Sequence, residues 1–296
     1  MLFDVVMRRP RFIPLGARSL PLALAALLGA VAPARLLSQD DHAAKGKIDD
    51  VEHSAENAKH HGSDHGDGDG PAVGLGVGFF DGVGSMARGF WHVFFHVPRD
   101  TGQGYLAHPY AGYDGSTFVV RGVDRGRTFG AVSASYFRDD GSSLRGGHFA
   151  IEWAGGMLDR TVEYSTFSEP LPDGTDHLSM LHIGVAALPP VGDAGYLKVG
   201  LAFQGVFTDQ GDVASGPELV LGAQLFPRRP FGVAAEARLA PLTWAGGPAF
   251  STGFADLMAN GSVFLGHAEL LAGYRWTRVG VGAAFEGPTV GLRMWF

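Results

Sequence analysis

The chain of 296 residues has no cysteine, and none of its apolar runs reaches the roughly 20 residues that a membrane-spanning helix needs. The missing cysteine excludes disulfide bonds, thiolate metal sites, cysteine nucleophiles and a lipid-anchored amino-terminal cysteine. Charged residues are also scarce, at 18%, and the net charge of −7 leaves no basic surface that could hold nucleic acid. Glycine (45 residues) and hydrophobic residues (46%) are plentiful, a composition typical of glycine-rich β structure near lipid.

The first 34 residues have the pattern of a secretory signal peptide. Arg8, Arg9, Arg11 and Arg18 precede the apolar segment 20–32, and a small-residue cleavage pattern ends at residue 34. A retained membrane anchor is the alternative, although the apolar core is short for spanning. We therefore expect residues 1–34 to be removed and the rest of the chain to be exported.

Residues 35–70 are rich in histidine and aspartate and contain few apolar side chains. Such a segment cannot bury enough surface to offset the entropy of ordering it, so the composition predicts a disordered periplasmic segment. Its most compact imidazole group, His60, His61 and His65, is a candidate for weak zinc, copper or nickel binding. The simpler alternative is a solvated linker, and no resident cofactor is expected.

Residues 71–126 combine a predicted amphipathic helix with an ordered loop. Aromatic and apolar side chains recur at three- and four-residue intervals over 79–95, which gathers them on one face of a helix that ends at Pro98. Several glycines weaken this helix, so it needs a surface to lie on. The membrane interface and the mouth of the following domain are the two candidates.

Residues 127–296 predict ten β-strands of about nine to thirteen residues, the length of a tilted membrane strand. Apolar residues alternate with polar ones along the strands. Leu197, Val199 and Leu201, for example, lie on one face, and Lys198 lies on the other. A soluble sandwich could show the same alternation. The connections, however, alternate between short and long, which favours an up-and-down barrel with short turns at one end and longer loops at the other.

The final stretch, 288–296, is the most specific part of this pattern. Val290, Leu292, Met294 and Phe296 lie on one wholly apolar face, while Arg293 lies on the other. A strand of this kind ending on an aromatic residue resembles the closing strand of bacterial outer-membrane β-barrel proteins. The resemblance implies an all-β, transmembrane, up-and-down antiparallel barrel surrounded by outer-membrane lipid, with the N-terminal segment in the periplasm. It also implies that these four residues form the signal read by the barrel assembly machinery.

The opposite parity of the strands places charged side chains in the lumen. The expected lumen residues are Glu152, Glu163, Lys198, Glu218, Glu236, Arg238, Asp256, Glu269, Arg275 and Arg293, together with His148 and His182. Ten strands enclose little more than their own side chains, so we expect these groups to pair and to plug the lumen. The alternative is a narrow conduit for small solutes.

The sequence pattern favours a non-catalytic scaffold or binding barrel as the function. The competing class is an outer-membrane hydrolase. The outer-membrane proteases also have ten strands, with acidic residues and a histidine at the external rim. Asp176 and His177, with Asp139, Asp140, Asp209 or Asp212, are the candidates for such a site. No Gly-x-Ser-x-Gly or His-Glu-x-x-His motif occurs in the chain.

Overall fold

The computed structural model describes residues 46–63 and 128–296, apart from 156–157, 173, 190, 192–194, 229 and 283; within the elements, side chains of 59–63, 128–129, 155 and 228 are not described. The predicted leader and the predicted amphipathic helix at 79–97 with its following loop lie outside the described residues. No helix among the described residues is long and apolar enough to cross a membrane.

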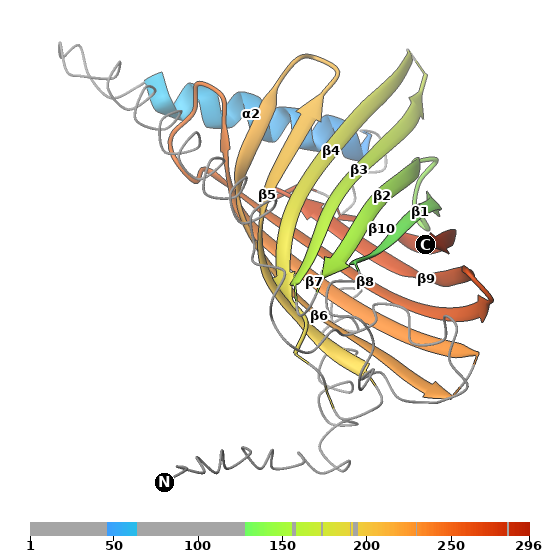
Figure 1. The fold of residues 1–296 in the computed structure, drawn as a ribbon. Coiled ribbons are helices and arrows are strands. Elements are labelled where there is room, and N and C mark those ends of the chain that lie inside the picture. Colours follow the sequence, from blue (N-terminus) through green and yellow to red (C-terminus); the bar gives the residue numbers. More distant parts are fainter. Residues whose placement is uncertain are drawn as a thin grey trace, which may run out of the picture.

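Ten antiparallel strands form one closed barrel, as predicted, with β1 paired to β10 (Figure 1). The strands are β1 (Thr128–Arg138), β2 (Arg145–Gly155), β3 (Leu158–Leu171), β4 (Gly174–Ala187), β5 (Gly195–Thr208), β6 (Val213–Arg228), β7 (Phe231–Trp244), β8 (Thr252–Leu265), β9 (Ala268–Val279) and β10 (Ala284–Trp295). Every strand pairs with its neighbours in sequence, so the barrel has up-and-down topology.

The seam between the first and last strands is fully paired over its described length. Backbone pairs run from Ala131 with Trp295 to Phe137 with Thr289. Beyond them, Gly130 and Phe296 exchange two backbone hydrogen bonds of 2.9 Å. A closed seam leaves no strand edge free, which is what a barrel inside a membrane requires.

Strands β3 to β8, with 14 or 16 residues, are longer than the sequence predicted because they continue into stretches expected to be loops, whereas β1, β2, β9 and β10, with 11 or 12 residues, have the expected length. The β3–β4 connection shrinks to residues 172–173, whereas β4 and β5 are joined at the other end by 188–194. The expected strict alternation of short and long connections is therefore wrong. Backbone pairing does not need apolar side chains, so polar residues such as Thr175 and Ser215 extend the ladder past the apolar band.

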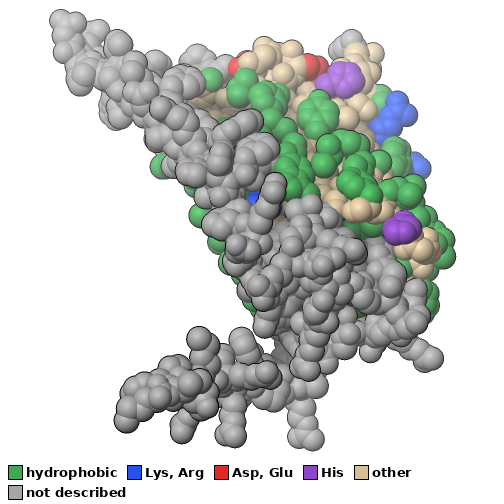
Figure 2. Space-filling model, viewed as in Figure 1, with side chains coloured by type: hydrophobic (Ala, Val, Ile, Leu, Met, Phe, Trp, Pro, Cys, Tyr) green, Lys and Arg blue, Asp and Glu red, His purple; other side chains and the backbone are tan. Residues whose placement is uncertain are grey.

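Outward-facing side chains are apolar over most of the barrel wall. Exposed examples are Tyr136, Phe149, Ile151, Tyr164, Leu197, Val199, Leu201, Leu219, Leu221, Leu239, Leu270, Val290, Leu292 and Met294. Figure 2 shows hydrophobic side chains gathered over the visible strand surface, with few charged side chains among them. A continuous apolar wall of this size needs an apolar environment.

Close backbone contacts explain part of the glycine content. A Cβ atom at Gly216 of β6 would lie 1.9 Å from the carbonyl oxygen of Pro241 on β7. Only glycine allows the two strands to approach this closely.

Residues 46–63, the described part of the segment 35–70, are ordered, which corrects the prediction of disorder for this part. Lys47–Ser63 form helix α2, which lies across one end of the barrel (Figure 1). Ile48, Val51 and Ala55 recur at helical spacing and are fully buried against the barrel. Three apolar residues cannot order an isolated segment, but they suffice for a helix that is offered an apolar surface, and that surface exists only after the barrel has formed.

Candidate functional site: a filled lumen and a capped end

The structure places all ten predicted lumen residues, with His148 and His182, inside the barrel. Their alternation with outward apolar residues sets this orientation, because successive side chains of a strand point to opposite faces. Ion pairs join side chains of different strands across the lumen. The polar interior is therefore a network held by several strands.

Arg238 on β7 is at the centre of this network. Its Nη1 and Nη2 atoms donate to both carboxylate oxygens of Glu163 on β3, at 2.6 and 2.7 Å. Its Nε atom donates to Glu236 at 2.6 Å. Lys198 on β5 continues the chain, with its Nζ atom 3.1 Å from Glu236 and 3.2 Å from Asp159. A bidentate arginine–carboxylate pair of this kind is the geometry that best compensates two buried charges.

Two further groups fill the space beside Arg238. Arg275 donates to both oxygens of Asp256, at 2.8 and 3.0 Å, and Thr277 donates to the same carboxylate at 2.6 Å. His182 and Glu218 form the second group, in which Nδ1 of His182 lies 3.0 Å from Oε1 of Glu218.

Near the start of β1 and the end of β10, Arg293 bridges two carboxylates. It donates to Glu152 at 3.0 Å and to Glu269 at 3.4 Å, and Nε1 of Trp295 also donates to Glu269, at 2.9 Å. The guanidinium carbon lies 5.5 Å from the Trp295 ring centre, within cation–π range. Tyr196 donates a hydrogen bond to Gln224 in the same region.

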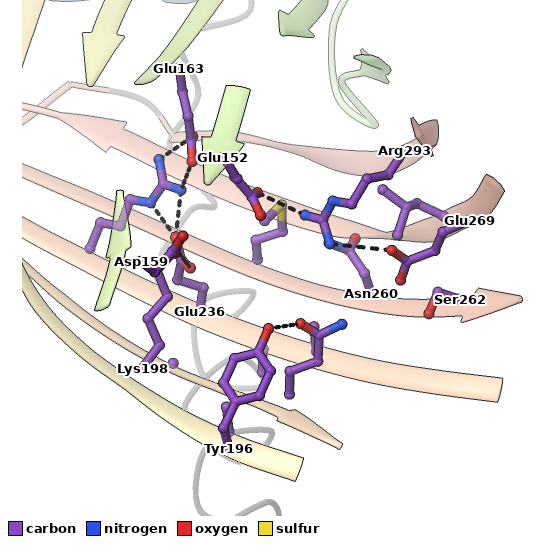
Figure 3. Close-up of a pocket in the computed structure, with 18 of the residues that line it drawn as sticks. Glu152, Asp159, Glu163, Tyr196, Lys198, Glu236, Asn260, Ser262, Glu269 and Arg293 are labelled. Carbon is purple, nitrogen blue, oxygen red and sulfur yellow. Dashed lines mark hydrogen bonds and ion pairs between the residues drawn. The ribbon is translucent and has the colours of Figure 1, made fainter. Parts of the chain in front are cut away.

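A cavity in the described part of the lumen lies between these groups (Figure 3). Its volume is about 70 Å³, and Tyr196, Lys198, Asn260, Ser262 and Arg293 are among its lining residues. One ordered water needs roughly 10–15 Å³ of such space, so the cavity has room for several water molecules.

Apolar side chains close the lumen on both sides of the polar layer. At the end of the barrel where β1 starts and β10 ends, the closing cluster is Ala131, Ala154, Leu188, Tyr196, Phe226, Phe264 and Trp295. At the opposite end, Phe137, Phe167, Leu178, Leu242, Trp244 and Phe285 belong to a larger cluster that includes Ile48, Val51 and Ala55 of α2. The lumen is thus filled along its length, and α2 is part of the filling.

Helix α2 is fastened to the rim of the barrel by polar contacts as well. Nζ of Lys47 donates to Asp139 at 3.0 Å and to the carbonyl oxygen of Ala284 at 2.8 Å. The first helical amide hydrogens are unpaired within the helix, and that of Ile48 is accepted by Glu169 at 3.0 Å. Further along the helix, Gln210 donates to Glu52 at 2.6 Å.

An acidic cluster lies at this junction. Asp49 and Glu52 of α2 and Asp176 of β4 each offer a carboxylate oxygen, and these oxygens all lie within 4.8 Å of one another. Burial, together with a side-chain hydrogen bond to Asp209 and the nearby carboxyl groups of Asp209, Asp176 and Asp49, raises the pKa of Glu52 to about 8. The cluster is therefore a place where negative charge is poorly compensated.

Of the rim residues expected for a hydrolase, Asp176, His177 and Asp209 lie close together, whereas Asp139 and Asp140 have partners elsewhere on the rim. Asp139 binds Lys47 of α2 and the backbone amide of Glu286, and Asp140 accepts a hydrogen bond from Tyr274. Asp209 accepts from the backbone amide of His177, whose side chain is exposed, and the backbone amide of Asp212 donates to Thr208. Asp176 faces α2 instead of a substrate cleft.

The remaining predicted residues have mixed outcomes. Val290, Leu292, Met294 and Phe296 are all exposed on the outer face of β10 or at its end, and their role as an assembly signal stays a prediction. His60 and His61 fall within the bounds of α2 but their side chains, like the whole of His65, lie outside what the structure describes.

Sequence reasoning missed two groups. Asp159 shares the inward parity of Glu163, so the strand pattern could have identified it as the partner of Lys198. Asp49 and Glu52 could not have been found in this way, because the sequence pattern predicted disorder for their segment.

Comparisons with known proteins give similarity to barrel structures alone. No protein-family model matches the chain, and no curated protein matches it. An anion-selective porin from Comamonas acidovorans is 13% identical with a TM-score of 0.29; the match covers 53% of this chain and 51%, about half, of the porin. The β domain of the Bordetella autotransporter BrkA is 11% identical with a TM-score of 0.34, covering 56% and 98% of the two chains. The transport unit of the autotransporter AIDA-I from Escherichia coli is 11% identical with a TM-score of 0.31, covering 60% and 94%.

Proposed function

We propose that the protein is an outer-membrane β-barrel that acts as a closed, non-catalytic scaffold or binding barrel. The observation that carries this proposal is the filled lumen. Charged side chains cross it in the middle, apolar clusters close it on either side, and the cavity between the charged groups is about 70 Å³. A barrel of this construction presents its wall, its rim and α2 to partners.

The outer wall supports the membrane location. Leu201, near the middle of β5, is 62% exposed, and its cross-strand neighbours Val185 and Leu219 are apolar as well. Hydrocarbon is the environment in which such residues are stable on an outer surface, since exposing an apolar wall of this extent to water is unfavourable.

The orientation follows from the ends of the barrel. In the outer-membrane class that the sequence resembles, the chain termini of the barrel face the periplasm. With β1 and β10 oriented in this way, α2 lies at the external mouth, because it contacts the connections at the opposite end. This proposal replaces the sequence-based expectation that residues 35–70 lie in the periplasm.

The first part of the test is electrophoresis of the purified full chain with and without heating. A membrane barrel that stays folded in detergent migrates differently before and after boiling. Unchanged migration would overturn the proposed membrane barrel.

The second part is conductance in planar bilayers, measured on a protein in which α2 is locked in place. Because the chain has no cysteine, Asp50→Cys with Gly282→Cys creates the only possible disulfide. A Cβ atom at Gly282 would lie 3.1 Å from that of Asp50, close to the roughly 3.5–4.5 Å of disulfide geometry.

A closed scaffold gives no discrete conductance steps in the wild-type protein, in the locked form or in the reduced form. Incorporation into the bilayer is checked by recovering the protein in its heat-modifiable form. Steps in the locked form would mean that the lumen conducts with α2 docked, and steps only after reduction would mean that α2 gates a pore. Either result would replace the closed scaffold by the narrow-pore function.

A further inference from the structure

The acidic cluster between α2 and the barrel has the dimensions of a cation site. Asp49 and Glu52 come from the helix and Asp176 from β4, and one oxygen from each lies within 4.8 Å of the other two. Oxygen ligands bind Ca²⁺ at about 2.3–2.6 Å, so two ligands on opposite sides of the ion are about 4.6–5.2 Å apart. The three oxygens are therefore close enough to share one ion.

The environment of Glu52 is an independent indication of a ligand. This side chain is only 4% exposed, and its Oε1 atom has no hydrogen-bond partner among the described residues. The Oδ2 atom of Asp176 is buried without a partner in the same way. A buried carboxylate without a partner is costly, because folding removes its water shell and returns nothing in exchange.

The surrounding charges do not compensate this cost. Asp209 adds a fourth carboxyl group beside Glu52. Lys47 of α2 binds Asp139 and the carbonyl oxygen of Ala284 at another part of the rim, and the side chain of the second lysine of α2, Lys59, lies outside what the structure describes. The described partners of Glu52 are the neutral amide of Gln210 and the carboxyl group of Asp209, so either a proton or a bound cation must compensate the charge of the cluster.

We propose that Asp49, Glu52 and Asp176 bind a divalent cation of the Ca²⁺ class that ties α2 to the end of the barrel. A site made only of carboxylate oxygens favours hard cations over the nitrogen- and sulfur-seeking transition metals. Ca²⁺ accepts irregular sets of oxygen ligands and completes them with water, whereas Mg²⁺ requires near-ideal octahedral geometry. Asp209, which interacts with Glu52, is a candidate for a further ligand.

This site gives α2 a function that does not depend on whether the lumen conducts. It would make the docking of α2 depend on the cation, because the ion joins two helical ligands to one ligand of β4. The site depends only on the packing of α2 on the barrel, so its failure would leave the closed-scaffold proposal standing.

The test is Ca²⁺ binding to the purified full chain in detergent, measured by isothermal titration calorimetry after treatment with a chelator. The variants are Glu52→Gln on the helix and Asp176→Asn on the barrel. Glu56→Gln is the matched control, since Glu56 lies one turn further along α2, is exposed and contacts only His53 among the recorded ion pairs. We expect at least tenfold weaker binding for each ligand variant and unchanged binding for the control.

Two results would overturn the proposal: no binding up to 10 mM Ca²⁺, set as roughly ten times the weakest calcium sites of extracellular modules, or equal binding by all four proteins. The second result would assign the ion to other carboxylates of the chain. Loss of helix docking in Glu52→Gln is controlled with the Asp50→Cys/Gly282→Cys disulfide, which holds α2 in place. The locked protein must bind Ca²⁺ as the wild type does, and must lose that binding when Glu52→Gln is added.

Discussion

Arg238 shows how single residues determine the interior of this barrel. It is 6% exposed and satisfies two carboxylates, Glu163 and Glu236, that come from different strands. Both acids have inward parity, so neither can reach water without disturbing the wall. The arginine is therefore needed to keep two negative charges stable inside the protein.

Replacing Arg238 by leucine should cost about 3–5 kcal/mol of unfolding free energy, because it leaves buried carboxylates without their cation. The measurement is a denaturant unfolding series in detergent micelles. Arg145→Leu is the control: Arg145 is exposed at the start of β2, and its replacement should change stability by less than about 0.5 kcal/mol. Equal effects of the two substitutions would show that the Arg238 pairs contribute nothing to stability.

At the scale of the strands, the alternation of side chains separates the two environments of the wall. Inward positions of β5 carry Lys198 and Gln204, and outward positions carry Leu197, Val199 and Leu201. The sequence pattern was sufficient to predict these orientations. It did not predict how far the strands extend, because backbone pairing beyond the apolar band leaves no mark in the side chains.

Leu201→Arg should destabilise the barrel by about 2–4 kcal/mol, since it places a charge on the lipid-facing wall near the middle of a strand. Leu265→Arg is the matched substitution at the end of β8, where an equally exposed leucine lies near the barrel end and the cost should be about 0–1 kcal/mol. Folding equilibria in lipid vesicles distinguish the two positions. A larger cost at Leu265 than at Leu201 would contradict the proposed position of the membrane.

Helix α2 shows the limit of reasoning about isolated elements. Its sequence has a mean polarity typical of solvated segments, yet Ile48, Val51 and Ala55 are among the most buried residues of the protein. The apolar stripe is too narrow to be distinguished from chance in a histidine- and aspartate-rich segment. Only the cluster at the barrel end makes it a docking surface.

At the scale of the whole molecule, the position of α2 has a consequence for topology. The helix contacts the connections after β1, β5 and β9, whereas the first residue of β1 and Phe296 lie at the other end. The two ends of a transmembrane barrel face opposite compartments. In the proposed membrane orientation, α2 and the start of β1 are therefore on opposite sides.

A cysteine introduced by Glu56→Cys should react with a membrane-impermeant maleimide on intact cells, because Glu56 is exposed on α2 at the proposed external mouth. His267→Cys, in the turn between β8 and β9 at the opposite end, should react only after the outer membrane has been permeabilised. Protection of Glu56→Cys in intact cells would place the helix in the periplasm and contradict its docking in the inserted barrel. Labelling is read by mass shift on a gel.

The sequence by itself determined the barrel class and the orientation of its side chains, because the alternation of faces is a property of each strand and is written directly in the order of residues. Tertiary structure decided which groups meet, since Arg238 and Glu163 are 75 residues apart and their distance depends on the tilt and stagger of the closed sheet. It also decided that a polar segment becomes a helix with a carboxylate cluster beneath it. That cluster joins residues of α2 to a residue of β4, and no local pattern could bring them together.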